Sequence, residues 1–478
     1  MSIVQRHLPK TDFFGRIDML RMLVVAATLA VLPVAHAVGP VVALERVSVK
    51  NGGASLQGDS FYAAISVDGR YVAFDSASED LVPGAVQPTA KQRVASSGDY
   101  PINVYLRDRV AGTTELISIG LNGTAPNNFS YTPSISDDGR YVGFASIASN
   151  LAPGDTNGLP DVFVRDRLLG TTARVSLAGD GPDTAGGGYV YPQVSSWMTG
   201  DGRYVVFCSP AKLTANNTNA HMHLYRRDLV ANTTVLIDVN PSNVAADNVA
   251  GCGASISTDG RFVMFLSAAN DILPNANPYL TLHLYVRDML AGVTTSLTPY
   301  LTMPGLCPFY AGQSGTYNLS RNGRFAMFDS TCTDLAAGQD PLDGAFVRDL
   351  LLGVTQPFRL NDGGAPGGYA RGDGVWPSMS NSGRYAVARS YTTNVVSGDS
   401  DAYSDVFLHD FVTARTFRIS QRADTGAPAN ESSYSPLLST GGRVIFASDA
   451  SNLVDGDDNG LRDIFVATLD AVFAAGFE

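Results

Sequence analysis

The chain has 478 residues and a formal net charge of −12. Hydrophobic residues make up 45% of it, which is too many for a disordered chain. Lysine occurs only at Lys10, Lys50, Lys91 and Lys212. Binding to nucleic acids or to anionic membranes relies on dense positive charge, so the composition argues against both kinds of partner.

Residues 1–37 have the pattern of an export signal. Arg16 and Arg21 precede the apolar run Met22–Leu32, and the small residues Ala35 and Ala37 mark a cleavage site. The run is about 11 residues long, roughly half of what spans a bilayer. We therefore expect a cleaved signal peptide, a periplasmic or extracellular location, and no membrane span afterwards. The alternative is an uncleaved anchor.

The rest of the chain repeats one sequence pattern about every 60 residues. A turn containing Gly-Arg is followed by an apolar strand, a polar loop, and a second strand that usually ends in Arg-Asp. The 48 glycines and 25 prolines agree with many short strands joined by turns. The seven turns lie at residues 68–70, 138–140, 201–203, 259–261, 322–324, 382–384 and 441–443.

Each repeat is predicted to form four strands, here called a to d. In the second repeat these are Ser130–Ser136, Tyr141–Phe144, Asp161–Asp166 and Ala173–Ser176. Strands b and c are apolar on both alternating faces, as strands buried on both sides are. Blades that pack against neighbouring blades bury both faces, so the pattern favours a β-propeller over a helical solenoid, for which no period of 3.6 residues is present.

The two ends of the repeat array predict how the ring closes. The last repeat has strand c, Ile464–Val466, but no strand d after it. Residues 44–48, at the start, resemble the d strands around Val175 and Ile419. We therefore expect an all-β, monomeric, seven-bladed propeller over residues 38–470. The N-terminal strand completes its last blade, and this closure removes the open sheet edges. Residues 471–478 form a C-terminal tail, for which a frayed end is the simplest interpretation.

The amino-acid sequence of the repeat resembles that of a known family. Ser136-Asp137-Asp138-Gly139-Arg140-Tyr141-Val142, followed by Asp161-Val162-Phe163-Val164-Arg165-Asp166, resembles the TolB-type, WD40-like propeller repeats of bacterial envelope proteins. The resemblance covers nearly the whole mature chain. It implies the fold and is weak for function, because families with such repeats include both periplasmic partner-binding proteins and the propeller halves of peptidases.

Three b–c loops share a pattern with metal-ligand character: Asp, then Asn or Asp two residues on, then Asp four residues further. Oxygen side chains on a glycine-containing turn can converge on Ca²⁺, here without the bidentate Glu of a full calcium loop. The same pattern is also that of Asx turns without a metal. The residues are Asp155, Asn157 and Asp161; Asp399, Asp401 and Asp405; and Asp457, Asn459 and Asp463.

Other polar residues of the repeats have simpler interpretations. His223 and His283 replace the last Asp of the motif in blades 3 and 4, and with His221 they could form a transition-metal site, although such histidines are more often polar residues at loop edges. The fifth repeat keeps only Asp340 and Asp343. The Arg-Asp pairs recur in most blades, so we expect a structural role, with the Asp starting the c–d turn.

The four cysteines are predicted to form two disulfides. Cys208 ends strand b of blade 3 and Cys252 begins strand a of blade 4, so these two residues are neighbours at one end of the ring. Cys307 and Cys332 fall at the same end of blade 5. Export to an oxidising compartment permits both bonds.

Function is expected on the top face, which we define as the face that carries the b–c and d–a loops. The bottom face carries the short a–b and c–d turns. Top loops vary in length, and variable loops on a rigid scaffold commonly bind ligands. The first hypothesis is a scaffold that binds a protein or glycan, with structural calcium and no catalytic residue. The alternatives are a calcium-dependent hydrolase or lyase, for which Tyr189, Tyr191, His221 and His223 are candidates, and a purely structural envelope component.

Overall fold

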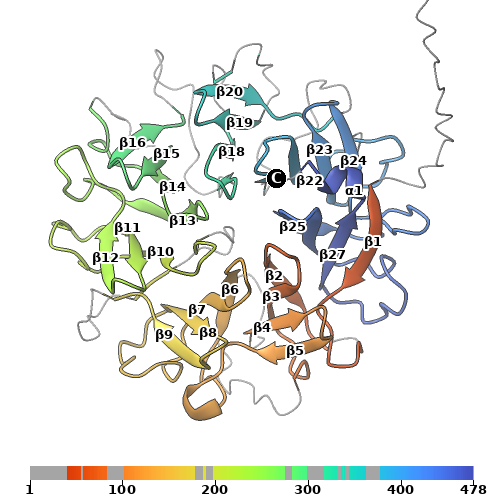
Figure 1. Ribbon diagram of the computed structural model, residues 1–478, viewed down its shortest axis with the longest axis horizontal. Coiled ribbons are helices and arrows are strands. Elements are labelled where there is room, and N and C mark those ends of the chain that lie inside the picture. The colour runs from red at the N-terminus through yellow and green to blue at the C-terminus, as the bar shows by residue number, and fades with distance from the viewer. Residues whose placement is uncertain are drawn as a thin grey trace, which may run out of the picture. The chain divides into compact units, whose positions relative to one another are not determined.

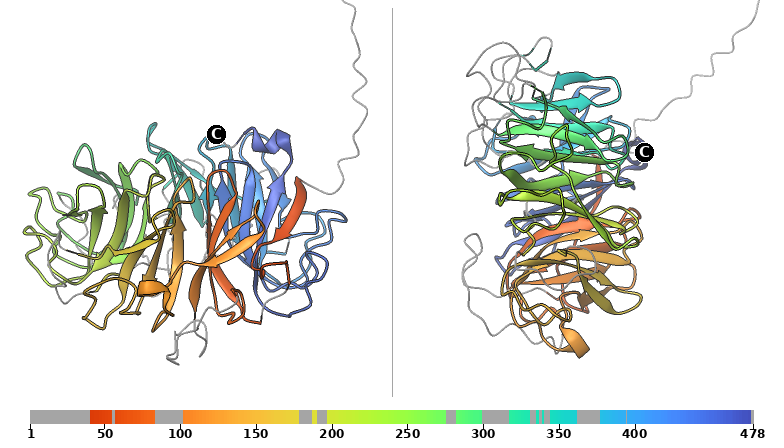
Figure 2. Two further views of the ribbon diagram at one scale, coloured as in Figure 1. Left: turned by 60° about the horizontal axis from the view of Figure 1, so that its bottom comes forward. Right: turned by 90° about the vertical axis from the view of Figure 1, so that its left-hand side faces the viewer.

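The computed structural model describes residues 40–54, 57–82, 102–177, 187–189, 197–274, 282–298, 317–330, 335–336, 339, 344–361, 377–393 and 395–476. Within the unit Ala37–Glu478, seven antiparallel sheets form a ring (Figure 1). The strands cross the thickness of the ring, so the connections gather on its two faces (Figure 2). The predicted seven-bladed β-propeller is confirmed.

Blades 1 to 4 follow one another along the chain. Blade 1 contains β2 (Ser60–Ile65), β3 (Tyr71–Ser76), β4 (Asn103–Asp108) and β5 (Thr113–Leu116). The 3₁₀ turn η1 (Leu121–Gly123) leads to blade 2, with β6 (Ser130–Ile135), β7 (Tyr141–Ser146), β8 (Asp161–Asp166) and β9 (Thr171–Arg174). Blade 3 has β10 (Tyr204–Ser209), β11 (His223–Asp228) and β12 (Thr233–Leu236), and bridges from Tyr189 and Met198 to β10 mark its innermost strand. Blade 4 has β13 (Ala250–Ile256), β14 (Phe262–Ser267), β15 (His283–Asp288) and β16 (Val293–Ser296).

Blades 5 to 7 complete the ring. Blade 5 contains β17 (Tyr317–Leu319), β18 (Phe325–Asp329), β19 (Ala345–Asp349) and β20 (Val354–Pro357). Blade 6 contains β21 (Ser378–Met379), β22 (Tyr385–Ser390), β23 (Asp405–Asp410) and β24 (Arg415–Arg418). Blade 7 contains β25 (Ser433–Ser439), β26 (Arg443–Ser448), β27 (Asp463–Leu469) and, from the N-terminus, β1 (Val41–Arg46), and the short helix α1 (Ala471–Ala474) follows.

The N-terminal strand closes the last blade, as predicted. Strand β1 pairs antiparallel with β27, from Val41 opposite Leu469 to Arg46 opposite Phe465. It begins and ends slightly earlier than expected from the sequence. The d strands show the same displacement: β9 covers Thr171–Arg174 rather than Ala173–Ser176, because Asp166 pairs with Thr171 directly after the turn.

The hydrophobic core lies between adjacent blades. One cluster joins Val104 and Leu106 of blade 1 to Phe144 and Phe163 of blade 2, all of them buried. Within blade 2 the rings of Phe144 and Phe163 stack with their centroids 5.9 Å apart. The apolar character of both faces of strands b and c therefore reflects burial against the blade on either side.

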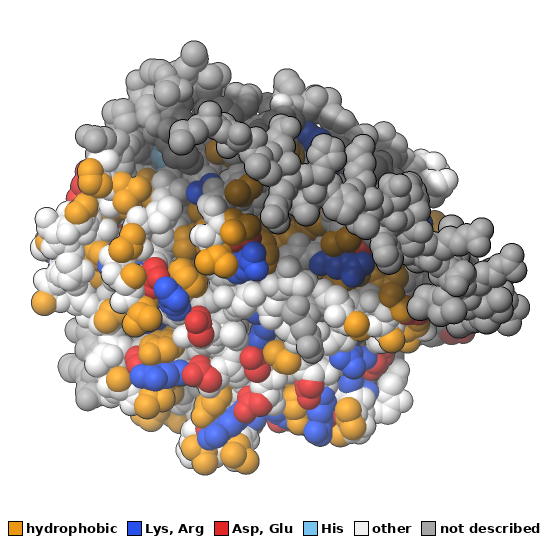
Figure 3. Space-filling model, turned by 45° about the horizontal axis from the view of Figure 1, so that its top comes forward, with side chains coloured by type: hydrophobic (Ala, Val, Ile, Leu, Met, Phe, Trp, Pro, Cys, Tyr) orange, Lys and Arg blue, Asp and Glu red, His pale blue; other side chains and the backbone are white. Residues whose placement is uncertain are grey.

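The Asp of the Arg-Asp sequence that ends strand c starts the c–d turn, as expected, and it forms an ion pair with the arginine of the Gly-Arg turn. Arg107, the arginine of the Arg-Asp sequence in blade 1, donates to the Thr114 hydroxyl. In blade 1, Asp108 accepts hydrogen bonds from the backbone N–H groups of Val110 and Ala111, and Arg70 of the Gly-Arg turn donates to both carboxylate oxygens. These bonds, with that from Arg70 first, lower the pKa of Asp108 to about 2. Basic and acidic side chains lie side by side around this face (Figure 3). The equivalent pairs are Arg140–Asp166, Arg203–Asp228, Arg261–Asp288, Arg324–Asp349 and Arg384–Asp410.

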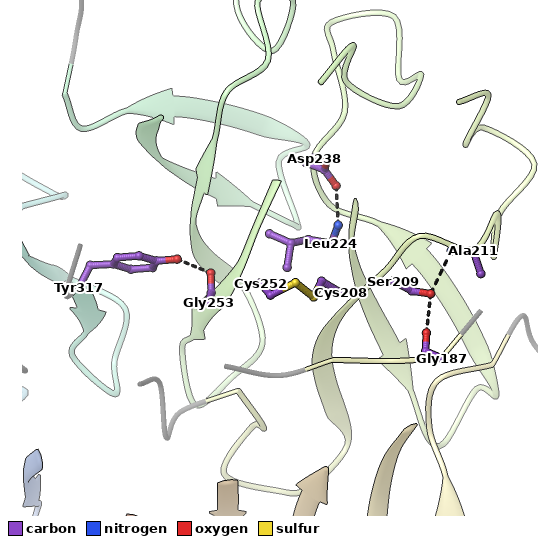
Figure 4. Close-up of a disulfide and its surroundings, with 9 residues drawn as sticks. All are labelled: Gly187, Cys208, Ser209, Ala211, Leu224, Asp238, Cys252, Gly253 and Tyr317. Atoms are coloured by element: carbon purple, nitrogen blue, oxygen red, sulfur yellow. Dashed lines mark hydrogen bonds between the residues drawn. A yellow bond between two sulfur atoms is a disulfide. The ribbon is translucent and has the colours of Figure 1, made fainter. Parts of the chain in front are cut away.

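One predicted disulfide is present and joins two blades. Cys208 of β10 is bonded to Cys252 of β13, with their Cα atoms 5.2 Å apart (Figure 4). Nearby, the Tyr317 hydroxyl donates to the Gly253 carbonyl, which continues the contacts to blade 5. Cys307 and Cys332, for which the second disulfide is predicted, lie outside the described residues.

A buried carboxylate occupies the same place in blade 1 as Cys208 does in blade 3. Asp75 accepts hydrogen bonds from the backbone N–H of Tyr62 in its own blade and of Thr132 in blade 2, both at 2.9 Å. Burial raises the pKa of Asp75 to about 6, although these hydrogen bonds act in the opposite direction. The inter-blade contact of Asp75 is therefore sensitive to pH.

We expect Asp75→Asn to reduce the pH dependence of stability. The pKa of Asp75 is higher in the folded than in the unfolded chain, so the folded state binds a proton more tightly at this carboxyl group. The stabilisation of the folded state by this proton is complete below pH 4 and is lost as pH rises through about 6. A shift of this size corresponds to about 2–3 kcal/mol. Denaturant unfolding of both proteins at pH 4.5 and 7.5 measures the difference. Parallel pH curves for the two proteins would contradict the prediction.

Candidate functional site

The three acidic loops lie on the top face, directly before strand c of blades 2, 6 and 7. Each makes an Asx turn, in which the middle side chain accepts a hydrogen bond from the backbone N–H two residues on. The bonds run from Leu159 to Asn157, from Tyr403 to Asp401 and from Leu461 to Asn459, at 2.8, 3.1 and 3.0 Å. The Asx turns of the alternative, metal-free interpretation are therefore present in all three loops.

An arginine from strand d enters each acidic loop, which the sequence interpretation missed. In blade 6, Arg418 Nη2 lies 2.8 Å from Asp399 Oδ1, and Arg418 Nε lies 3.2 Å from Asp405 Oδ2. The three side chains are 7%, 3% and 2% exposed. The Ser420 hydroxyl donates to the other oxygen of Asp405. A buried guanidinium therefore already neutralises part of the acidic loop.

Blades 2 and 7 repeat this arrangement. Arg46 Nη1 donates to Asp457 at 2.6 Å and to Asp463 at 3.4 Å, and Ser48 donates to Asp463. In blade 2, Arg174 lies 3.4 Å from Asp155 and 3.7 Å from Asp161, and Ser176 donates to Asp161. The ion pair therefore belongs to the fold of these three blades.

The sequence does contain a signal for this pairing. Arg-x-Ser ends strand d in the three blades whose strand c begins with Asp. In blades 1, 3 and 4 strand c begins with Asn103, His223 and His283, and the position of the arginine is taken by Leu116, Leu236 and Ser296. The two positions vary together between blades because their side chains meet.

Blade 6 differs from the other two loops in its middle residue. The amides of Asn157 and Asn459 donate to Asp161 and Asp463 at 2.9 and 3.0 Å, whereas Asp401 has no N–H to donate. Carboxylate oxygens of Asp399, Asp401 and Asp405 lie within 4.8 Å of one another. This acidic cluster could hold a metal ion.

The electrostatics of the blade 6 loop follow from this crowding. Burial raises the pKa of Asp405 to about 7, and the charges of Asp399 and Asp401 raise it further against the effect of Arg418. Burial also raises the pKa of Asp399. Asp399 Oδ2 is buried and accepts no hydrogen bond from the described residues. A proton or a cation at this loop would relieve the repulsion.

The histidines do not form a metal site among the described residues. His223 is buried, and its two ring nitrogens lie 2.6 Å from Asp238 and from Asn219. His283 Nδ1 lies 3.2 Å from the Thr298 carbonyl, and burial lowers the pKa of His283. Both are therefore held by polar partners of their own blade, which take the place of the Asp, Arg and Ser set.

A second feature of the top face is a group of arginine and aromatic side chains, here called the top-face aromatic cluster. It consists of Phe61, Arg389, Tyr391, Tyr434 and Arg462, at the upper ends of blades 1, 6 and 7. The Arg462 guanidinium lies 4.2 Å from the centre of the Tyr434 ring and 5.9 Å from that of Phe61. Arg389 lies 5.6 Å from the Tyr391 ring and 5.9 Å from the Tyr434 ring. Aromatic and arginine side chains are the residues that dominate binding energy at interfaces.

Polar partners hold the centre of this cluster. Arg462 makes two ion-pair hydrogen bonds to Asp449, at 2.7 and 3.0 Å, and the Tyr434 hydroxyl donates to the same carboxylate at 2.9 Å. Tyr391, at the edge, is 40% exposed. The sequence interpretation missed this cluster because its members come from three blades.

Three of the four lyase candidates, Tyr189, His221 and His223, lie within the described residues. Tyr189 pairs by backbone hydrogen bonds with Cys208, His221 is exposed, and Tyr191 lies outside the described part. No helix of the described chain is long and apolar enough to cross a bilayer.

Comparisons with known proteins show a likeness in fold. The sequence matches no protein-family model and no curated protein. Among solved structures, TolB from Acinetobacter baumannii is 18% identical with a TM-score of 0.32, over 61% of this chain and 52% of that one. An oligogalacturonate lyase in complex with manganese is 12% identical with a TM-score of 0.49, over 91% of this chain and 99% of that one.

A structure from an analysis of two prolyl endopeptidases is 10% identical with a TM-score of 0.45, over 86% of this chain and 50% of that one. The matched part therefore spans about half the length of the TolB and endopeptidase structures. At these identities the likeness concerns the fold. The chain is a seven-bladed propeller whose structural neighbours include TolB proteins.

Proposed function

We propose that this protein is an exported binding scaffold, periplasmic or extracellular, which binds a protein or glycan through its top face. The observation that carries the proposal is the top-face aromatic cluster. Arginine and aromatic side chains from three blades meet there, where a flat sugar ring or an aromatic side chain can stack and an anionic group can bind the guanidinium groups. The inter-blade disulfide and the apolar run before residue 37 support export.

On the bottom face, contacts between blades link the a–b turns to one another. Arg321 of blade 5 pairs with Asp137 of blade 2, and backbone hydrogen bonds link the a–b turns of successive blades, from Val67 to Asp137, Gly200, Thr258 and Arg321. In most blades an ion pair between the arginine of the Gly-Arg turn and the Asp that ends strand c holds these turns. A calcium-dependent hydrolase or lyase remains the alternative use of the top face, and no specific contact among the described residues favours it.

We expect binding to depend on the top-face aromatic cluster. Removing the guanidinium and the exposed ring in Arg389→Ala/Tyr391→Ala should weaken binding at least tenfold, as loss of interface hot spots does. The mature protein would be titrated against a panel of neutral and acidic polysaccharides and of purified envelope proteins. Leu290→Ser on the bottom face, where Leu290 is 82% exposed, is the matched control. A ligand that binds both variants equally would place the binding surface elsewhere.

Structural calcium is proposed for the blade 6 loop. When their carboxylates are ionised, the motif residues of blade 6 and Arg418 carry a net charge of −2, whereas those of blades 2 and 7 with their arginine carry −1. Asp399, Asp401 and Asp405 supply the oxygen ligands that Ca²⁺ prefers. Calcium would order the loop that precedes β23 and so the adjacent top face.

We expect Ca²⁺ to raise the thermal unfolding temperature of the mature protein above that measured with a chelator. A ligand at 100 times its dissociation constant adds about 2.7 kcal/mol to the stability of the folded state. Asp401→Asn, which gives blade 6 the residue found in blades 2 and 7, should abolish the shift while the protein remains folded. Equal shifts for wild type and this variant would show that calcium binds elsewhere, and no shift at millimolar Ca²⁺ would show that Arg418 and protons suffice.

A further inference from the structure

His223 and Asp238 form a buried pair near the top face of blade 3. His223 begins strand c, β11, and Asp238 lies two residues after the end of strand d, β12. Neither side chain is exposed to solvent, and His223 Nδ1 lies 2.6 Å from Asp238 Oδ2. The other oxygen of Asp238 accepts a hydrogen bond from the backbone N–H of Leu224 at 2.8 Å (Figure 4). Both carboxylate oxygens are therefore held by neighbouring residues of strand c.

Asn219 determines which ring nitrogen of His223 must carry a proton. Asn219 Oδ1 lies 2.6 Å from His223 Nε2 and also accepts a hydrogen bond from the backbone N–H of His221 at 3.0 Å. Asn219 Nδ2 donates to the Ala246 carbonyl at 2.8 Å. The opposite orientation of the amide would bring two donors together at His221 and two acceptors together at Ala246, so the oxygen faces His223. Because this oxygen only accepts hydrogen bonds, Nε2 carries a proton.

A second proton lies between the ring of His223 and the carboxylate of Asp238. In a neutral imidazole whose proton is on Nε2, the atom Nδ1 offers only a lone pair. That lone pair would face a carboxylate oxygen at 2.6 Å, which is a repulsive contact between two acceptors. With a proton between them, the same contact is a short charge-assisted hydrogen bond. The pair therefore holds two protons, as an imidazolium beside a carboxylate, and has no net charge.

Two further ionisable side chains face Asp238. Its negative charge acts on Tyr225 of β11 and on Arg287 of β15 in the next blade. His221, which precedes the pair on the b–c loop, is exposed. Burial raises the pKa of Asp238, and the opposing effect of His223 is smaller. Loss of the shared proton would thus leave a buried carboxylate against the lone pair of the ring.

Blade 4 has the same arrangement with a neutral partner. His283 begins β15, and Thr298 takes the place of Asp238: its hydroxyl accepts a hydrogen bond from the backbone N–H of Leu284 at 3.1 Å. Burial lowers the pKa of His283, so this ring is neutral at pH 7. The carboxylate of Asp238 is therefore what makes the histidine of blade 3 a buried cation.

Through Asn219, the charged pair holds two loops of the top face together. Asn219 lies in the b–c loop of blade 3, residues 210–222, and its amide is bonded to Ala246 in the d–a loop, residues 237–249. The side chain of Asn216 donates to a carbonyl of the same d–a loop. The proton on His223 Nε2 fixes Asn219 in the position from which it joins the loops.

We propose that the His223–Asp238 pair is a pH-sensitive latch for these two loops, closed by the shared proton and released when that proton is lost at alkaline pH. A histidine in an opened or unfolded chain loses its proton above a pH of about 6.5. The closed loops keep it, so each opening releases one proton, and the opening equilibrium rises by about tenfold per pH unit above that value until the closed pair loses its proton too. The latch does not depend on the ligand binding proposed above.

Nitrogen-15 NMR of the mature protein, labelled at histidine, measures the protonation of the pair. We expect both ring nitrogens of His223 to be protonated at pH 7, whereas His283 carries a proton on one nitrogen only. The signals that change in Asp238→Thr identify His223. A ring nitrogen of His223 without a proton at pH 7 would overturn the proposal.

Hydrogen exchange of backbone amides measures the release of the loops. After correction for the intrinsic effect of pH on exchange, the protection factors of the two loops should fall by about tenfold per pH unit from pH 7 to pH 9. Those of β26 and β27 in blade 7 should stay constant. Asp238→Thr copies the pair of blade 4 and keeps an acceptor for the N–H of Leu224, so it should fold and show no such fall. Constant protection in wild type, or an equal fall in the variant, contradicts the latch.

Discussion

Replacement of Arg418 by alanine is expected to destabilise the protein by about 3–5 kcal/mol at pH 8, the usual cost of leaving a buried charge without its partner. Arg418 is 7% exposed and contacts both Asp399 and Asp405. Without the guanidinium, these carboxylates repel each other in a buried site. Denaturant unfolding of the two proteins measures the loss.

The loss should be smaller at pH 5. The pKa of Asp405 is about 7 with Arg418 present, and removal of a positive charge that lowers it would raise it further. The variant therefore binds a proton in its folded state at pH 5, which removes the repulsion. Arg415→Ala is the matched control, since Arg415 lies exposed on the same strand and should cost less than 1 kcal/mol. Equal losses for the two variants would mean that the guanidinium does not stabilise the acidic loop.

Removal of the Cys208–Cys252 disulfide has the other large expected effect. The bond closes a loop with a sequence separation of 44, for which the chain-entropy model gives about 4 kcal/mol. The double alanine variant should therefore unfold at a markedly lower denaturant concentration than wild type under oxidising conditions. Because the bond joins blades 3 and 4, its loss should loosen the junction between them.

Cys307→Ala/Cys332→Ala is the companion variant and tests the second predicted disulfide. If that bond exists, the variant should be less stable than wild type under oxidising conditions, and reduction should lower the stability of wild type by at least as much.

Stability of the Cys208→Ala/Cys252→Ala variant within 1 kcal/mol of wild type would show that burial between the blades, and not the covalent bond, holds this junction.

The sequence by itself determined the blade architecture of this protein. The Gly-Arg turns and the strands that are apolar on both faces are local patterns, and they recur in each repeat. The blades and their order therefore follow from the sequence without knowledge of distant contacts. Closure by β1 was also readable, because the last repeat lacks strand d and the N-terminus supplies one. The Cys208–Cys252 bond followed from placing each cysteine on its strand.

Only the tertiary structure decided what surrounds the acidic loops. Arg46 reaches Asp457 across a sequence separation of 411, and Arg418 meets Asp399 only once strands c and d are in register. The spacing of the aspartates is the same whether a cation, a proton or a guanidinium sits among them, so spacing could not distinguish these partners.

The top-face aromatic cluster was hidden for the same reason. Arg462 and Tyr434 lie in blade 7, Phe61 in blade 1 and Arg389 in blade 6, so the cluster forms only when these blades meet. Strand patterns are set by neighbours in the sequence, whereas this surface is set by side chains that approach one another only when the ring closes.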